Sequence, residues 1–379
     1  MPIPDHRAAR LATRLSFLVA GFGMACWAPL VPLAKQRLGV DDGVLGLLLL
    51  CLGAGSVAAM LLTGALSARY GSKPIVIVGG LGLAILLPPL AIIDTPVGLG
   101  LTLFAFGAAL GSIDVAMNIH AVEVERAAER PLMSGFHAQF SIGGFAGSAA
   151  MTFLLAQQTG PLASTLVCAI PMIVAMILTS PRLLQTARTL DSPLFARPRG
   201  IVLLLAALAA ITFLVEGAML DWGALLLTSS GRVPATRGGV GYMLFSIAMT
   251  AGRLGGDAVV ARIGDRKTLA FGGCVAIAGF VLLLASPITA IAMAGFLLIG
   301  LGASNIVPVL FRRAGAQTAM PPGLAIAAIT TAGYAGVLLG PAGIGFVAEF
   351  SSLQTAFGLL AALLGCVTLC ARRVTAKAT

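Results

Sequence analysis

The chain has 379 residues, of which 58% are hydrophobic and only 10% are charged, and its mean hydropathy is +1.01. In a soluble domain about a quarter of the residues are charged. A soluble domain with this composition would expose large apolar patches that promote aggregation. The formal net charge of +10 does not indicate a nucleic-acid-binding protein, because the basic residues lie singly between apolar runs. These values predict a membrane protein that crosses the bilayer many times.

Apolar segments of membrane-spanning length recur along the whole chain. A helix rises 1.5 Å per residue, so about 20 apolar residues cross the hydrocarbon core. The first segment follows three arginines, as in a signal peptide, but it is too long for one and no A-x-A-like cleavage site follows, so we expect it to be retained. Cutting the sequence at charges and at Pro and Gly turns predicts twelve spans: 15–34, 43–66, 74–93, 97–118, 133–156, 162–180, 200–227, 238–261, 268–285, 288–311, 323–348 and 354–371.

The basic residues predict the orientation of these spans. If the N-terminus is cytoplasmic, all but four of the 24 Lys and Arg residues fall on the cytoplasmic side, the exceptions being Lys35, Arg37, Arg232 and Arg237. The positive-inside rule therefore places both termini in the cytoplasm. The longest polar stretch predicts a cytoplasmic linker at 181–199, between an N-terminal six-helix bundle at 1–180 and a C-terminal six-helix bundle at 200–379.

A weak internal repeat relates the two predicted bundles. Four short matches recur in the same order, with an offset that shrinks steadily along the chain: 23–27 with 218–222, 69–71 with 262–264, 111–114 with 302–305, and 144–147 with 333–336. Six helices per bundle give both bundles the same topology. The repeats are therefore parallel, related by an axis along the membrane normal.

The segment 64–73, which reads G-A-L-S-A-R-Y-G-S-K, carries a resemblance to a known family. It resembles the cytoplasmic signature G-x-L-x-D-R-x-G-x-K/R of the major facilitator superfamily, although Ala68 stands where the family usually has Asp. The resemblance implies an all-α membrane protein with twelve transmembrane helices in two parallel six-helix repeats. The signature segment and its second-half copy supply candidate gating or structural charges: Arg69, Arg253, Asp257 and Arg262.

Within that family the chain is similar to the fucose-permease-like branch and its bacterial relatives. The similarity rests on 111–118, on Glu216 followed by Asp221 and Trp222, and on Gly333-Tyr334 and Gly340-Pro341. In that branch an acid and an Asn in the fourth membrane helix serve proton and substrate binding, and they map onto Asp114 and Asn118. The resemblance also implies a location in the bacterial inner membrane.

Few ionisable side chains occur inside the predicted spans, and each costs at least about 2.5–3.5 kcal/mol to insert, so they mark functional positions by default. Asp114 and Asn118 are four residues apart and share one helix face. His137 lies at a similar predicted depth, and we expect it to tune Asp114 as a protonatable group; a structural polar clamp is the alternative. Glu216 is expected to line the cavity, or else to make a structural hydrogen bond, with Asp221 one turn nearer the outer mouth.

The remaining candidates are weighed in the same way. Arg253 and Asp257 are four residues apart and are expected to pair near the cytoplasmic end, in a gating or structural role. Trp27 and Trp222 are equivalent in the repeat, and they either anchor at the interface or stack on a sugar-like or aromatic substrate. Two weaker candidates for lining the cavity are Asn305, which the repeat aligns with Asp114, and Tyr334.

These features favour a secondary active transporter that moves a small polar or amphipathic solute by alternating access, with proton-coupled symport as the favoured mechanism. A proton-driven exporter and a transporter-like sensor without flux are the alternatives. An enzyme is disfavoured because no HExxH, GxSxG or P-loop motif occurs, and the six cysteines lack metal-ligand spacing. We expect no catalytic residue, cofactor, metal or nucleic-acid partner; the expected partners are the substrate, protons and the bilayer, and the functional unit is a monomer.

Overall fold

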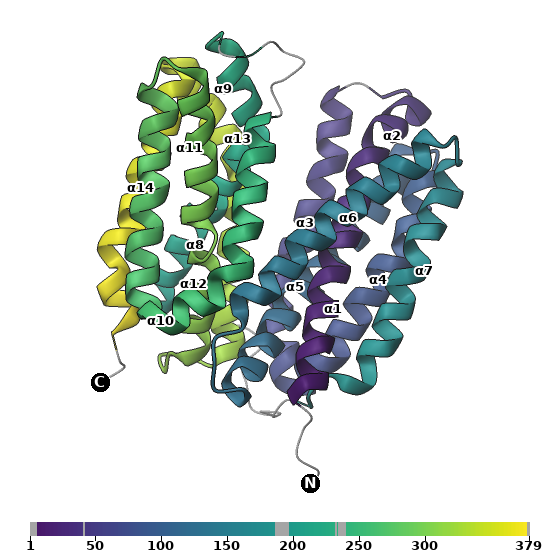
Figure 1. Cartoon of the computed structure of the whole chain (residues 1–379). Coiled ribbons are helices and arrows are strands. Elements are labelled where there is room, and N and C mark those ends of the chain that lie inside the picture. The colour runs from purple at the N-terminus through teal and green to yellow at the C-terminus, as the bar shows by residue number, and fades with distance from the viewer. Residues whose placement is uncertain (1–5, 41, 186–196, 232, 234–239, 377–379) are drawn as a thin grey trace. The chain divides into compact units, whose positions relative to one another are not determined.

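The computed structural model describes residues 6–40, 42–185, 197–231, 233 and 240–376, and this part of the chain is almost entirely helical, without strands. The core of the predicted linker, 186–196, lies outside the described residues. The helices, labelled as in Figure 1, are α1 (His6–Trp27), η1 (Ala28–Leu30), α2 (Val31–Leu38), α3 (Asp42–Tyr70), α4 (Ser72–Ile92), α5 (Pro96–Ala127), α6 (Met133–Ala156), α7 (Pro161–Thr179), η2 (Ser180–Arg182), α8 (Ile201–Asp221), α9 (Gly223–Ser229), α10 (Val240–Ala285), α11 (Thr289–Ala303), α12 (Ile306–Ala316), α13 (Pro322–Phe350) and α14 (Leu353–Thr375).

Eleven helical stretches among the described residues are long and apolar enough to cross a membrane, which confirms the predicted all-α membrane fold. The longest, α10, has 46 residues and would measure about 69 Å, twice the thickness of the hydrocarbon core. Its backbone is not helical at Gly264, where φ is 77° and ψ is 164°. The break at Gly264 divides α10 into the two spans predicted at 238–261 and 268–285.

Two predicted spans are interrupted, which the sequence reading missed. The span predicted at 200–227 consists of α8 and α9, and the one predicted at 288–311 consists of α11 and α12. Pro308 explains the second break, because proline has no N–H to donate to the carbonyl four residues earlier, at Ser304, and its ring clashes with that carbonyl in a continuous helix. The backbone carbonyl of Ser304 therefore needs another partner inside the membrane.

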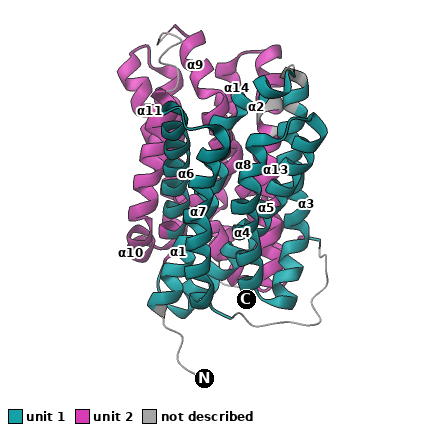
Figure 2. Cartoon of the chain, turned by 90° about the vertical axis from the view of Figure 1, so that its right-hand side faces the viewer, with its two compact units in different colours: residues 1–130, 136–197 teal, residues 131–135, 198–379 magenta. Residues whose placement is uncertain are grey.

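The chain divides into two compact units, coloured separately in Figure 2. Unit 1 comprises residues 1–130 and 136–197, and unit 2 comprises 131–135 and 198–379. In unit 1, α5 packs against both α3 and α4, and α1 packs against α4, α5 and α7. Glycines bring α3 and α5 together: a Cβ at Gly107 would collide with the carbonyl oxygen of Leu52, and one at Gly111 with that of Ser56. Small residues at such positions let helix backbones approach closely in lipid.

The substitution Gly107→Ala should lower the free energy of unfolding by about 1–3 kcal/mol, because the added methyl group forces α5 away from the backbone of α3. Thermal unfolding of the purified protein in detergent would measure this loss. Gly365→Ala on α14 is the matched control, since a Cβ there meets nothing within 4 Å. Equal stability of the two variants would contradict the close packing.

Arg37 in α2 caps the C-terminal end of α4 in unit 1. Its Nε donates to the carbonyl of Ile93 at 3.0 Å, Nη1 to that of Ala91 at 2.7 Å and Nη2 to that of Leu90 at 2.9 Å. These carbonyls belong to the last turn of α4 and its C-cap, where helical partners are missing and the helix dipole favours a cation. Arg37 is one of the four basic residues that the predicted orientation places outside, and its structural task explains why it is there.

In unit 2, α10 lies beside α11 and α14, and α8 lies beside α13 (Figure 1). The residue after the Gly264 break, Asp265, accepts a 2.6 Å hydrogen bond from Nη1 of Arg312 on α12. This ion pair fastens the second-half copy of the signature segment to the neighbouring helix. Arg262 of the same segment is exposed, as is Arg69 in unit 1, whose guanidinium lies 5.5 Å from the centre of the Tyr70 ring.

Candidate functional site

Two polar side chains that the sequence singled out meet inside α5. The amide Nδ2 of Asn118 donates to the backbone carbonyl of Asp114 at 2.9 Å and to its carboxylate Oδ1 at 3.1 Å. Asn118 is fully buried and Asp114 is 9% exposed. The Oδ1 atom of Asn118 has no hydrogen-bond partner among the described residues. Buried acceptors are rarely left unsatisfied, so this atom is available to a polar ligand or to water.

His137 lies in the second turn of α6 and is buried in unit 1. Its ring packs edge-on against Phe17 of α1, with ring centroids 5.3 Å apart, and Phe17 also stacks on Phe136 at 5.8 Å. The pairing of His137 with Asp114 stays a prediction.

The main polar contact of unit 2 joins α8 to α10. Nη2 of Arg253 lies 3.3 Å from Oε1 and 3.4 Å from Oε2 of Glu216. On its other side, Nε of Arg253 donates at 3.3 Å to the carbonyl of Ser304, the one that Pro308 leaves free. Arg253 is 7% exposed. Its guanidinium therefore bridges a carboxylate within the membrane and the broken helix α11–α12.

Asn305 stands in the break itself and is tied to α10. Its Nδ2 donates to the carbonyl of Gly252 at 3.0 Å and to Oγ of Ser304 at 2.9 Å. A Cβ at Gly256 would overlap the Oδ1 atom of Asn305, so this side chain fits only because position 256 is glycine. The structure thus gives Asn305 a packing task between two helices, whereas the sequence suggested only that it lines the cavity.

Asp257 lies one turn beyond Arg253 on α10. Its carboxylate accepts hydrogen bonds from the backbone N–H groups of Ser134 and Gly135, each at 3.0 Å. These N–H groups are in the first turn of α6, where a helix has no acceptor of its own and where its dipole favours an anion. This capping explains why 131–135 groups with unit 2. The predicted pairing of Arg253 with Asp257 stays a prediction.

The aromatic candidates differ in their surroundings. Trp27 is 5% exposed, and neither its Nε1 nor that of Trp222 has a hydrogen-bond partner among the described residues. The Trp222 ring packs against Gly345 of α13 and follows Asp221, which is exposed at the end of α8. An interface anchor presents its N–H to water or headgroups, and these two buried N–H groups do not. Tyr334 is half-buried, 6.5 Å from the Phe213 ring of α8.

The sequence reading overlooked His120, a fully buried residue in α5. Its Nε2 accepts from the backbone N–H of Leu184 at 2.9 Å, and its Nδ1 lies 3.1 Å from Oγ1 of Thr13. Because the Thr13 hydroxyl donates to the carbonyl of Ala9 at 2.8 Å, Nδ1 must carry the proton and the imidazole is neutral. His120 thereby fixes the point where the chain leaves α7 and η2 for the predicted linker. Its position in the sequence, just beyond the predicted span 97–118, gave no sign of these partners.

Replacing His120 with Leu should lower the free energy of unfolding by about 1–3 kcal/mol, because the N–H of Leu184 and the hydroxyl of Thr13 each lose a partner. His120→Gln can still accept at one end and donate at the other, so we expect a smaller loss. Thermal unfolding of both variants would test the anchor. A leucine variant as stable as the parent protein would show that these hydrogen bonds contribute nothing.

The sequence model of the Major Facilitator Superfamily matches residues 15–319, most of the chain. The chain belongs to the major facilitator superfamily. An uncharacterised MFS-type transporter of Yersinia pestis is 47% identical over 367 residues, covering 97% of this chain and 96% of that protein. The membrane protein MosC of Rhizobium meliloti is 31% identical over 374 residues, covering 97% and 90%.

Solved structures agree on the fold. The E. coli fucose:proton symporter FucP has a TM-score of 0.77 to this chain at 16% identity, covering 97% of this chain and 98% of that one. The human organic anion transporter MFSD10 has a TM-score of 0.78 at 16% identity, covering 97% and 100%. The resemblance to the superfamily found in the signature segment is confirmed. This major facilitator protein is an integral membrane transporter and not an enzyme.

Proposed function

We propose that this transporter moves a small polar or amphipathic solute by alternating access and couples that movement to protons as a symporter. The observation that carries the proposal is the contact of Arg253 with both Glu216 and the carbonyl of Ser304, at a helix break inside a membrane-spanning segment. Discontinuous helices with charged partners are where transporters of several folds bind substrates and ions.

A membrane-buried ion pair suits coupling because it is stable only when both charges are present. Protonation of Glu216 removes the negative charge opposite Nη2 of Arg253 and so weakens the attraction between the two side chains. A polar or acidic group of the substrate can then take the place of the carboxylate. Proton and substrate would therefore bind together, which is what symport requires.

Asp114 supplies a second protonatable group in the other half, with His137 proposed to tune it. The acceptor Oδ1 of Asn118, one turn away, offers a substrate hydroxyl or amide a buried partner. Trp27, Trp222 and Tyr334 would line the apolar part of the cavity, and Asp221 its outer mouth. The similarity to FucP, a fucose:proton symporter, is consistent with such a solute.

The proposed topology has six-helix bundles at 1–180 and 200–379, a linker at 181–199, and both termini in the cytoplasm of a bacterial inner membrane. Arg69, Asp257 and Arg262 would act at the cytoplasmic gate, where the Asp257 carboxylate caps the first turn of α6. The functional unit would be a monomer.

A ligand screen by thermal shift, followed by transport assays in proteoliposomes, tests the proposal. We expect a hit to accumulate when the outside is acidic and to lose this accumulation when a protonophore collapses the gradient. Accumulation driven by an acidic interior would identify an exporter working by antiport. Binding without uptake or counterflow would identify a sensor and overturn the transport proposal.

A further inference from the structure

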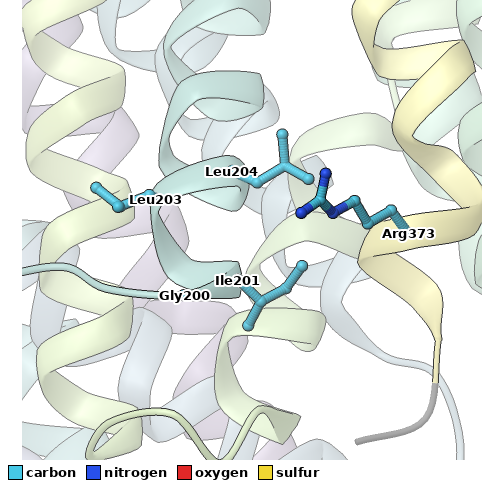
Figure 3. A pocket seen from close by; sticks show the side chains of 5 residues that line it. All are labelled: Gly200, Ile201, Leu203, Leu204 and Arg373. Carbon is cyan, nitrogen blue, oxygen red and sulfur yellow. The ribbon is translucent and has the colours of Figure 1, made fainter.

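A hollow of about 580 Å³ lies in unit 2 where α8 begins and α14 ends. It is lined by Gly200, Ile201, Leu203, Leu204 and Arg373 (Figure 3). Figure 3 shows the side chains of Leu204 and Arg373 extending toward each other from the two helices, with Ile201 beside them. Gly200 contributes no side chain, and its positive φ of 58° starts α8 abruptly. The hollow thus combines an aliphatic wall with one cation.

Three arginines at this end of unit 2 are engaged with protein groups. Arg313 donates to the carbonyls of Val374 at 2.9 Å and Ala376 at 2.8 Å, and Arg312 pairs with Asp265. Arg199 donates to the carbonyl of Ala319 at 3.2 Å. Within the described part of the chain, neither Arg373 nor Arg372 has a hydrogen bond or ion pair, and only Arg373 lines the hollow.

The position of the hollow indicates what occupies it. The first turn of one membrane-spanning helix and the last turn of another meet at the level of the lipid headgroups. A free phosphate would use the guanidinium but would gain nothing from the aliphatic side chains. A lipid with an anionic headgroup uses both, because its phosphate binds arginine while the upper acyl chain covers apolar surface.

We propose that this hollow binds an anionic phospholipid, with the phosphate on the Arg373 guanidinium and the acyl chain along Ile201, Leu203 and Leu204. The lipid would hold the start of α8 against the end of α14, so that the second six-helix bundle is completed by a molecule from the bilayer. This inference rests on membrane insertion alone and does not depend on the transport mechanism.

Native mass spectrometry of the full-length protein, titrated with phosphatidylglycerol in detergent, would test the site. We expect Arg373→Ala to weaken binding of the tightest lipid about fivefold, which corresponds to about 1 kcal/mol. Arg372→Ala, which removes the same charge from the adjacent exposed position, should leave that affinity unchanged. Arg373→Lys should retain most of it.

Several outcomes would overturn the proposal. If Arg372→Ala and Arg373→Ala weaken binding equally, the lipid is held only by the general positive charge of this end. Phosphatidylcholine binding as tightly as phosphatidylglycerol would remove the role of the anionic headgroup. Displacement of the lipid by millimolar inorganic phosphate would show that the aliphatic wall contributes nothing.

Discussion

Replacing Arg253 with Met should destabilise the transporter by about 3–5 kcal/mol, and adding Glu216→Gln should recover most of that loss. The single substitution leaves the half-buried carboxylate of Glu216 deprived of the cation at 3.3 Å, and it also removes the donor to the carbonyl of Ser304. The double substitution removes both charges, so that neither is left without the other. Thermal unfolding of the single and double variants, arranged as a double-mutant cycle, would measure the coupling between the two residues.

Arg262→Met is the matched control for this cycle. It removes the same charge from an exposed position later in α10, so it should change stability by about 0.5 kcal/mol or less. A double variant no more stable than Arg253→Met alone would contradict a pair held together by charge. In that case the destabilisation would come from the helix break at Ser304.

Hydropathy located the membrane helices well because it depends on a property of each segment alone. The bounds of α6 agree with the predicted span 133–156. The two spans that are joined in α10 are separated by the backbone break at Gly264, which the repeat aligns with Gly71 of the signature segment. The break at Ser304 was less visible, although Pro308 was a signal: a proline inside an apolar run removes the partner of the carbonyl four residues earlier.

Contacts between helices could not be predicted in this way. Glu216 and Arg253 are 37 residues apart, and their meeting depends on the rotation and depth of α8 and α10, which hydropathy does not encode. The same holds for His120, whose partners lie 107 and 64 residues away. Local spacing did succeed for Asp114 and Asn118, since residues four apart on one helix are neighbours whatever surrounds them.

These contacts show what the side chains at aligned positions of the internal repeat do. The repeat aligns Asn305 with Asp114, and the two side chains perform different tasks. Asp114 sits in a continuous helix and receives hydrogen bonds from Asn118, whereas Asn305 sits in a helix break and ties it to α10. The acid of unit 2 stands instead on α8, at Glu216, where Arg253 reaches it. The two halves share a scaffold and place their ionisable groups on different helices.

Asp114→Asn should abolish proton-driven accumulation without unfolding the protein. Asparagine keeps the shape of the side chain and an oxygen that accepts from Nδ2 of Asn118, but it cannot gain or lose a proton. A gradient of one pH unit supplies about 1.4 kcal/mol per proton, enough for about tenfold accumulation of a neutral solute. We expect the inside-to-outside ratio in proteoliposomes to fall from about ten to about one, while counterflow exchange of the solute persists.

Two further variants show which acid couples to the proton. Asp265→Asn removes an acid of unit 2 that pairs with Arg312, and it should leave the accumulation ratio unchanged. Glu216→Gln tests the pair in unit 2 by the same measurement. If Asp114→Asn still accumulates solute about tenfold while Glu216→Gln does not, the proton acts at Glu216 and Arg253. Asp114 and Asn118 would then serve substrate binding alone, because a group that never changes its protonation cannot transmit the gradient.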